Sequence, residues 1–295
     1  MSMRTSRKLR IKAYVIKHTP AFLQKRLNSF LYKRAIGRSL NWKNLNAYTE
    51  KMQWAKFYDR DQMKTLLSDK YLVREWVSKK IGKEFLIPLI GVWDKFSEID
   101  FNSLPNQFVL KTNHGSGSVL IVKDKEKFDI ANARKLFNDW MSIDYAYATG
   151  FELQYSNIKR KIIAEKYLET DLGELQDYKF LCFDGKPYYC WVDLGRFGKH
   201  TRNVYNLDWE LQPWNQYTYG NSKDPIPKPK NFEKMVEIAT SLCQGFSHVR
   251  VDLYNIDGVI YFGEMTFTNG CGFDKIIPDE YDYILGQLWN INTKD

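Results

Sequence analysis

The sequence has little of what several protein classes require. It holds only four cysteines, without CxxC or other metal-ligand spacing, and these are too few for a disulfide scaffold: Cys182, Cys190, Cys243 and Cys271. No run approaches the roughly 18 apolar residues of a membrane span, and no apolar leader with a small-residue cleavage site is present. We therefore expect free thiols, a globular chain and a cytoplasmic location.

Histidine is also scarce. The four histidines are scattered along the chain and form no Ser-His-Asp or Cys-His pattern, which argues against a nucleophilic triad. We expect His18, His200 and His248 to be structural. His114 lies in a glycine-rich segment, where it has either a phosphate contact or a simple loop role.

Acidic residues are absent from the first 49 positions. These hold twelve of the 44 Lys and Arg, which leaves 32 bases against 35 acids in the rest and places the whole excess of the net charge of +9 at the N-terminus. A helix is predicted from Pro20 to Gly37. Six apolar residues would share one of its faces: Phe22, Leu23, Leu27, Phe30, Leu31 and Ile36.

This basic segment has two interpretations. Residues 1–38 suit an anionic membrane surface, at the inner face of the membrane, or a polyanionic substrate. Alternatively, the helix packs on the main domain with its charges in water. The sequence argues against nucleic acid, because no recognition motif and no basic excess follow later in the chain.

After residue 60 the pattern is mixed helix and strand. A helix is predicted over 62–82, strands over 108–111 and 119–124, a helix near 130–142, a buried strand over 161–168 and a helix near 231–244. Two hairpins are predicted around Asp184-Gly185 and Asp257-Gly258. Residues 195–230 are expected to form irregular loops.

A glycine-rich turn is the first candidate for chemistry. In KTNHGSGSVLIVK, residues 113–118 lack bulk, so backbone N–H groups can approach phosphate oxygens, while Lys111 and Lys123 supply charge from the flanking strands. The segment is neither a Walker loop nor GxGxxG. Taken alone, it suits a phosphate clamp or an ordinary glycine hairpin.

The last predicted hairpin is the second candidate. Strand alternation puts Arg250, Asp252 and Tyr254 on one face, and the facing strand offers Glu264 and Thr266. Converging carboxylates are costly unless a cation neutralises them, and hard oxygen ligands suit Mg²⁺. The alternative is a surface hairpin with solvated acids.

These motifs together resemble a known family. The order of five motifs looks like that of the ATP-grasp superfamily: Asp69-Lys70, FVLK with its glycine loop, IIAEKYL, RVD and GEMT. Six longer segments resemble the TupA-like ATP-grasp family of bacterial surface-polysaccharide synthesis: LSDKYLVREWV, IPLIGVWD, LPNQFVLKTNHGSGS, YKFLCFDGKP, RVDLY and YFGEMTFT. The likeness runs from about residue 45 to 290. It implies an α+β ATP-grasp fold, in which two lobes with antiparallel sheets clasp ATP.

The resemblance also implies a division of the chain. A basic helical segment over 1–60 would precede an ATP-grasp domain over 61–295. Within that domain, the nucleotide lid lobe would span about 105–165 and the catalytic lobe about 166–290. The N-terminal segment departs from the family pattern, because it lacks the βαβ arrangement of the usual preceding lobe.

Residue roles follow from the same resemblance. Lys70 and Lys111 match two lysines directed at ATP phosphates, and Lys179 matches a lysine near the nucleotide. The phosphate lid of the family is matched here by the loop residues His114, Gly115, Ser116, Gly117 and Ser118. The hinge of the family, whose backbone reads the adenine edge, is matched by Glu165, Lys166, Tyr167 and Leu168. Asp171 or Glu174 is the candidate for the ribose hydroxyls. Arg250 matches a phosphate-contacting arginine, and Asp252 and Glu264 match two Mg²⁺ ligands.

The third metal contact departs from the family pattern. Many ATP-grasp enzymes place asparagine two residues after the second carboxylate, where this chain has Thr266. Three possibilities remain open: Thr266 coordinates weakly, Asn269 reaches in from the next turn, or water fills the place.

The implied activity is an ATP- and Mg²⁺-dependent ligation of a carboxylate to an amine through an acyl phosphate, during capsule or cell-wall polysaccharide synthesis. The partners would be an acidic sugar or polysaccharide precursor and an amine. A mixture of cations and flat rings within 195–230 suits an acidic sugar, with a core-covering loop as the alternative: Arg196, Lys199, His200, Arg202, Trp209, Trp214, Tyr217 and Tyr219. Rival functions are a kinase, a glycosyltransferase and a non-catalytic glycan binder.

Overall fold

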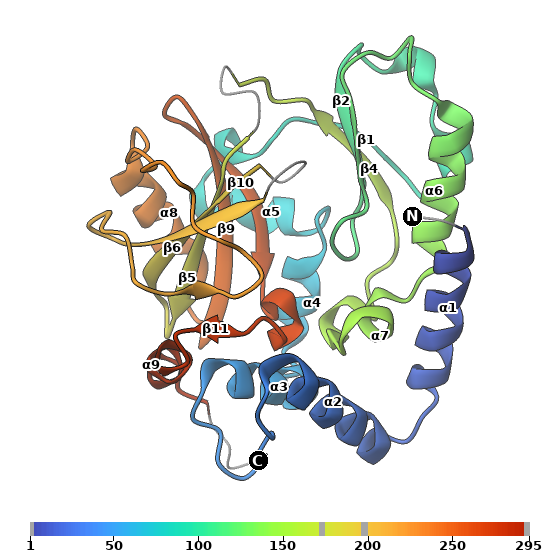
Figure 1. Cartoon of the computed structure of the whole chain (residues 1–295). Coiled ribbons are helices and arrows are strands. Elements are labelled where there is room, and N and C mark those ends of the chain that lie inside the picture. The colour runs from blue at the N-terminus through green and yellow to red at the C-terminus, as the bar shows by residue number, and fades with distance from the viewer. Residues whose placement is uncertain (1–2, 171–174, 196–199, 292–295) are drawn as a thin grey trace. The chain divides into compact units, whose positions relative to one another are not determined.

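The computed structural model describes residues 3–170, 175–195 and 200–291 (Figure 1). The chain divides into two compact units. The first comprises residues 1–24, 60–76 and 86–168, and the second comprises residues 25–59, 77–85 and 169–295. Each unit has its own antiparallel sheet and its own core.

The first unit is built on a four-stranded sheet in the order β1-β4-β2-β3, whose strands are β1 (Leu89–Trp93), β2 (Phe108–Thr112), β3 (Val119–Val122) and β4 (Ile162–Lys166). Its helices are α1 (Met3–Lys17), α4 (Gln62–Ser68), α6 (Ile130–Ser142) and α7 (Tyr145–Thr149). Phe137 of α6 packs in a core with Phe108 and Leu110 of β2. That core holds the glycine-rich turn between β2 and β3 in place.

The second unit is built on a five-stranded sheet in the order β10-β9-β5-β6-β7 (Figure 1). Its strands are β5 (Asp177–Phe183), β6 (Lys186–Leu194), β7 (Thr201–Asn206), β9 (His248–Ile256) and β10 (Val259–Thr266). A two-stranded sheet joins β8 (Asn215–Gln216) to β11 (Ile276–Ile277), and the helices are α3 (Tyr48–Tyr58), α8 (Phe232–Cys243) and α9 (Glu280–Leu288). Two further helices, α2 (Ala21–Ile36) and α5 (Val73–Ile81), cross from one unit to the other.

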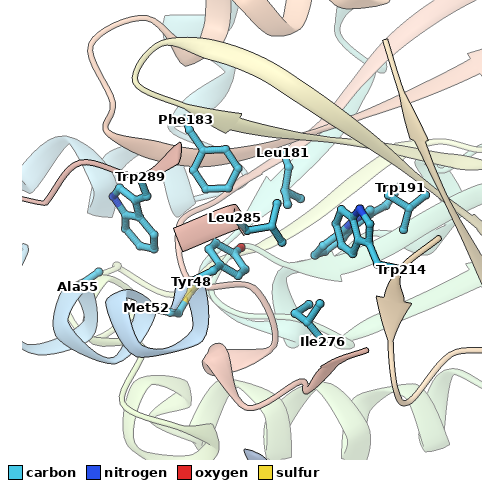
Figure 2. Packing of buried hydrophobic residues seen from close by; sticks show 11 residues of the cluster. Tyr48, Met52, Ala55, Leu181, Phe183, Trp191, Trp214, Ile276, Leu285 and Trp289 are labelled. Carbon is cyan, nitrogen blue, oxygen red and sulfur yellow. The ribbon is translucent and has the colours of Figure 1, made fainter. Parts of the chain in front are cut away.

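The two faces of the five-stranded sheet differ in character. On one face, Phe180 stacks against Phe232 of α8. On the other, Leu181 and Phe183 belong to an aromatic cluster with Tyr48 of α3 and Trp289 (Figure 2). Because strand residues alternate between faces, Asp177 and Lys179 of β5 lie on the same face as this cluster, further along the strand. One sheet face therefore carries an apolar region and a charged region side by side.

Several sequence predictions are confirmed. The helices near 130–142 and 231–244, the buried strand within 161–168 and both Asp-Gly hairpins are present. The helix predicted from Pro20 to Gly37 is α2, and Gly37 ends it with a φ of +92°. The four cysteines are free thiols. Among the described residues, no helix combines the length and the apolar character of a membrane span.

The predicted helix over 62–82 is wrong as a single element. It breaks into α4 and α5, because the Asp69 carboxylate accepts hydrogen bonds from the backbone N–H groups of Tyr71 and Leu72. Such a side-chain bond to the backbone competes with helical bonding and favours a turn. The break places Lys70 in a turn and not on a helix face.

The apolar face predicted for α2 is also wrong. The helix buries Asn28, Tyr32 and Ile36, whereas Phe22 and Phe30 are 61% and 62% exposed. Hydrogen bonds decide which face is buried, because Asn28 donates to Gln53 and the Tyr32 hydroxyl pairs with that of Thr49. Apolar spacing alone does not reveal such polar partners.

Residues 195–230 are more regular than predicted, since they contain β7 and β8. The sequence of β7, TRNVYN, lacks the apolar alternation of a strand because its buried side chains include Arg202 and Asn203. Their polar groups are satisfied inside the protein, where Asn203 bonds the Tyr205 hydroxyl. The strand is last in the order of the sheet, where it pairs with β6, and it also forms isolated bridges from Thr201 to Gly220 and from Tyr205 to Leu211.

Candidate active site

The glycine-rich turn of the first unit is held by hydrogen bonds at both ends. The Thr112 amide donates to the Ser118 carbonyl, and the Asn113 side chain accepts from the Lys161 amide and donates to the Lys159 carbonyl. Gly115 has a φ of +106°, and a Cβ there would lie 2.5 Å from the Tyr145 ring, so only glycine fits. Ser116 and Gly117 at the tip are exposed.

Two lysines of this unit, Lys70 and Lys111, each have a partner within the protein, and their contacts with ATP phosphates stay a prediction. Lys70 Nζ donates to the Gly115 carbonyl at 2.7 Å. Lys111 Nζ lies 2.6 Å from Glu165 Oε2 on the neighbouring strand β4. Glu165 also accepts from Arg74 at 3.0 Å, and Arg74 in turn donates to the Ile87 carbonyl. The structure therefore brings together Lys111, Glu165 and Arg74, of which the sequence analysis missed Arg74.

The remaining predicted residues of this unit differ in exposure. Lys166 is exposed, Leu168 is buried, and the Tyr167 ring lies 5.7 Å from the Lys123 ammonium. His114 is buried, and burial followed by repulsion from Arg160 lowers the pKa of its imidazole to about 4. It is therefore neutral at pH 7. Its phosphate contact stays a prediction, as do the hinge roles of residues 165–168.

The charged region of the second unit centres on Arg250 of β9. Its guanidinium donates to both carboxylate oxygens of Asp252 at 2.7 Å, to Glu264 Oε1 at 3.1 Å and to the Thr266 hydroxyl at 3.1 Å. The register explains this convergence, because Glu264 lies opposite Asp252, and Thr266 lies opposite Arg250, across β9 and β10. All three residues predicted to bind metal therefore point at one place.

Lys179 of β5 continues the network. Its ammonium lies 3.2 Å from Asp252, 3.3 Å from Asp177 and 3.6 Å from Asp193. Asp193 of β6 accepts from Nε and Nη2 of Arg202, whose guanidinium lies over the rings of Trp191 and Tyr219. Burial pushes the pKa of Asp193 up, but the ion pairs with Arg202 and Lys179 outweigh burial and hold it well below its ordinary value.

The sequence analysis missed Asp177 and Asp193, and it placed Arg202 in a substrate loop. Strand alternation could have revealed both aspartates, because residues two apart on a strand lie on the same face. Asp177 precedes Lys179 by two residues, and Asp193 follows the buried Trp191 by two. Arg202 is 4% exposed and committed to Asp193, so it is part of the network and not of an open loop. Asp171 and Glu174 lie outside the described residues, as do Arg196 and Lys199.

The donor chemistry of this region fits a hard divalent cation. Asp252, Glu264 and Thr266 offer only oxygen atoms, and no group of three or more His, Cys, Asp or Glu with metal-binding geometry occurs within the described ranges. Four carboxylates of the network face three cations, Lys179, Arg202 and Arg250, which leaves one excess negative charge. Nucleotide phosphates would add further negative charge, which a bound divalent cation would offset. Asn269 is less available, because its Oδ1 accepts from the Tyr48 hydroxyl at 2.6 Å.

The sheet of the first unit carries lysines beside a glycine-rich turn, and the sheet of the second unit carries a cluster of Arg, Asp and Glu. The chain belongs to the TupA-like ATP-grasp family, whose match covers residues 50–290.

The chain is also similar to several solved structures at low sequence identity. D-alanine–D-alanine ligase from Bacillus anthracis is 19% identical, with a TM-score of 0.44 over 76% of this chain and 64% of that one. The Helicobacter pylori ligase is 13% identical, with a TM-score of 0.40 over 83% and 70%. D-cycloserine synthetase DcsG is 15% identical, with a TM-score of 0.40 over 84% of each chain. The chain thus spans about two thirds of the length of the Bacillus ligase. No curated protein matches the sequence significantly.

Proposed function

We propose that this enzyme activates a carboxylate with ATP and joins it to an amine. The observation that carries the proposal is the convergence of Asp252, Glu264 and Thr266 on the Arg250 guanidinium, with Lys179 beside Asp252. In this reaction, a carboxylate oxygen attacks the γ-phosphorus and ADP leaves with the electrons of the broken P–O bond. The amine then attacks the acyl carbon, loses a proton and displaces inorganic phosphate.

The residues of each unit would serve this reaction by charge and position. Arg250 and Lys179 would stabilise negative charge on the transferring phosphoryl oxygens, and Lys70 and Lys111 would bind nucleotide phosphates. Asp252, Glu264 and Thr266 would hold Mg²⁺, which supplies further charge neutralisation when bound. Glu165 fixes Lys111 before the nucleotide arrives, so less ordering is needed on binding.

The carboxylate substrate we propose is an acidic sugar or a polysaccharide precursor, for capsule or cell-wall synthesis. Support comes from the family match. The test supplies ATP, Mg²⁺, pooled uronic acids and pooled amines. Release of ADP and phosphate that requires both pools supports the ligase, whereas ADP with a stable phosphate ester indicates a kinase, and turnover of a nucleotide sugar without ATP indicates a glycosyltransferase.

We also propose that the enzyme docks on an anionic membrane through helix α1. Its inner face is packed in the first unit, where Ala13 is 1% exposed. Three large apolar side chains at helical spacing lie on the other side: Ile11, Tyr14 and Val15 are 55%, 68% and 57% exposed. The exposed cations Arg7, Lys8 and Arg10 flank them. Apolar residues bordered by bases, with no acid nearby in sequence, suit the interface of an anionic bilayer.

A further inference from the structure

A hollow of about 470 Å³ lies in the second unit beside the two-stranded sheet. Its walls come from the turn before β8, from β8 itself and from β11, and its lining residues are Leu211, Gln212, Pro213, Trp214, Asn215, Asn221, Ile277 and Pro278. None of these side chains is ionisable. Aliphatic and proline surfaces alternate with three amide side chains, which donate and accept hydrogen bonds without carrying charge.

Trp214 is the most informative member of the lining. Its side chain, labelled in Figure 2, is 2% exposed. Its ring stacks on Tyr281 and lies edge-on to Tyr189. Its indole Nε1 nonetheless has no hydrogen-bond partner in the part of the chain that the structure describes. An unsatisfied buried donor costs about 1–3 kcal/mol. This nitrogen is shielded from solvent, so Trp214 serves as a reporter of the wall of the hollow and not as a hydrogen-bond donor to a ligand.

The hollow is also connected to the charged network. Asn215 lines it and donates to the Arg202 carbonyl, while the next residue, Gln216, accepts from the Arg202 guanidinium. Arg202 in turn fixes Asp193, which lies 3.6 Å from the Lys179 ammonium. A ligand in the hollow would therefore rest on the strand that supports the proposed phosphoryl-transfer residues.

We propose that this hollow binds a neutral, hydroxyl-rich ring, such as a hexopyranose next to the reacting group of the substrate. Hydroxyl groups match the amides of Gln212 and Asn221, and the C–H faces of such a ring match Leu211 and Ile277. A phosphate or carboxylate would find no cation in the lining. This inference extends the proposed function by naming a second recognition site for a glycan substrate.

The test measures binding without ATP, so it does not depend on turnover. The full chain, labelled with ¹⁵N-indole tryptophan, is titrated with methyl glucoside, methyl galactoside and N-acetylglucosamine, and the Trp214 indole resonance is assigned from its loss in Trp214→Phe. At least one sugar should shift that resonance in a saturable manner. Glucuronic acid should bind no more tightly than the matching neutral sugar.

Surface variants complete the test, because they leave the core intact. Gln212→Ala and Asn221→Ala should each weaken sugar binding about fivefold, as expected for one neutral hydrogen bond. The control Gln287→Ala changes an exposed amide on α9 and should leave the affinity unchanged. The proposal is overturned if no sugar shifts the Trp214 resonance, or if both hollow variants bind as Gln287→Ala does. If the enzyme has ligase activity but no sugar shifts the Trp214 resonance, the sugar site is rejected and the proposed ligase function stands.

Discussion

Arg250 and Asp252 lie two residues apart on β9, and their side chains form two parallel hydrogen bonds of 2.7 Å. Burial alone would lower the pKa of the Arg250 guanidinium. The attraction to Asp252 outweighs burial, so the net effect is a pKa above the ordinary value for arginine. The charged network therefore keeps its arginine protonated at any physiological pH. We expect this pair to contribute both to the proposed catalysis and to the local stability of the sheet.

The two proposed metal carboxylates should respond differently to neutralisation. Glu264→Gln should lower kcat by at least about a hundredfold with little change in Tm, because the Glu264 side chain is 27% exposed. Asp252→Asn should lower kcat as much, and should also cost about 3 kcal/mol of stability, because it removes the buried carboxylate that both Arg250 and Lys179 contact. Steady-state kinetics and urea unfolding of both variants check this. Wild-type kcat in Glu264→Gln would refute the metal assignment.

Lys111 is predicted to matter for nucleotide affinity. Lys111→Ala removes a charge fixed by Glu165 and should weaken Mg-ATP binding about tenfold, which corresponds to a charged hydrogen bond of about 1.5 kcal/mol. Calorimetry measures the affinity. Lys127→Ala, which removes a lysine whose side chain is 85% exposed, is the matched control and should stay within about twofold of wild type. Equal affinities of the two variants would place the phosphate contact elsewhere.

His114 should make stability depend on pH. Its folded pKa of about 4 lies below the unfolded value of 6.5, so the unfolded chain binds a proton in that window and stability falls as the pH drops from about 6.5 toward 4. Between pH 7 and 5, this group should cost about 2 kcal/mol. His114→Asn should lose that part of the pH dependence in urea titrations. An unchanged pH dependence in the variant would show that His114 is not buried in neutral form.

The local patterns were predictable from the sequence because short-range rules govern them. The Asp-Gly hairpins fix the pairing of β5 with β6 and of β9 with β10, and alternation then places Arg250, Asp252 and Glu264 on one face. The burial of polar residues inside the protein could not be predicted from these rules. The burial of Arg202 depends on Asp193, Trp191 and Tyr219, whose approach is set by tertiary packing and leaves no periodic signal.

The N-terminal region illustrates the same limit. Arg38 lies 2.6 Å from Asp279 and also pairs with Asp282, both more than 200 residues away in sequence. The basic composition of residues 1–49 gives no sign that one of its cations supports the fold. A deletion of residues 1–38 would remove this contact together with α2, so point variants on α1 are the better probe of the membrane proposal.

Vesicle binding should depend on the exposed side of α1. Wild-type protein should bind anionic vesicles in a flotation assay at low salt, with about 1 kcal/mol from each engaged base, and should be released as salt rises. Ile11→Asp combined with Val15→Asp should abolish binding, while Val259→Asp, an exposed apolar residue of the second unit, should not. No binding by the wild type at low salt would refute the membrane proposal and leave the ligase proposal untouched.

The most direct test of the proposed reaction follows one oxygen atom. Once the screen has identified a carboxylate substrate, that substrate is supplied with ¹⁸O in its carboxylate, together with ATP, Mg²⁺ and the amine, and the released phosphate is analysed by mass spectrometry. An acyl phosphate requires that one ¹⁸O atom pass from the carboxylate to the inorganic phosphate in each turnover, with formation of the amide. Unlabelled phosphate, or phosphate retained on the substrate as an ester, would contradict the proposed ligase.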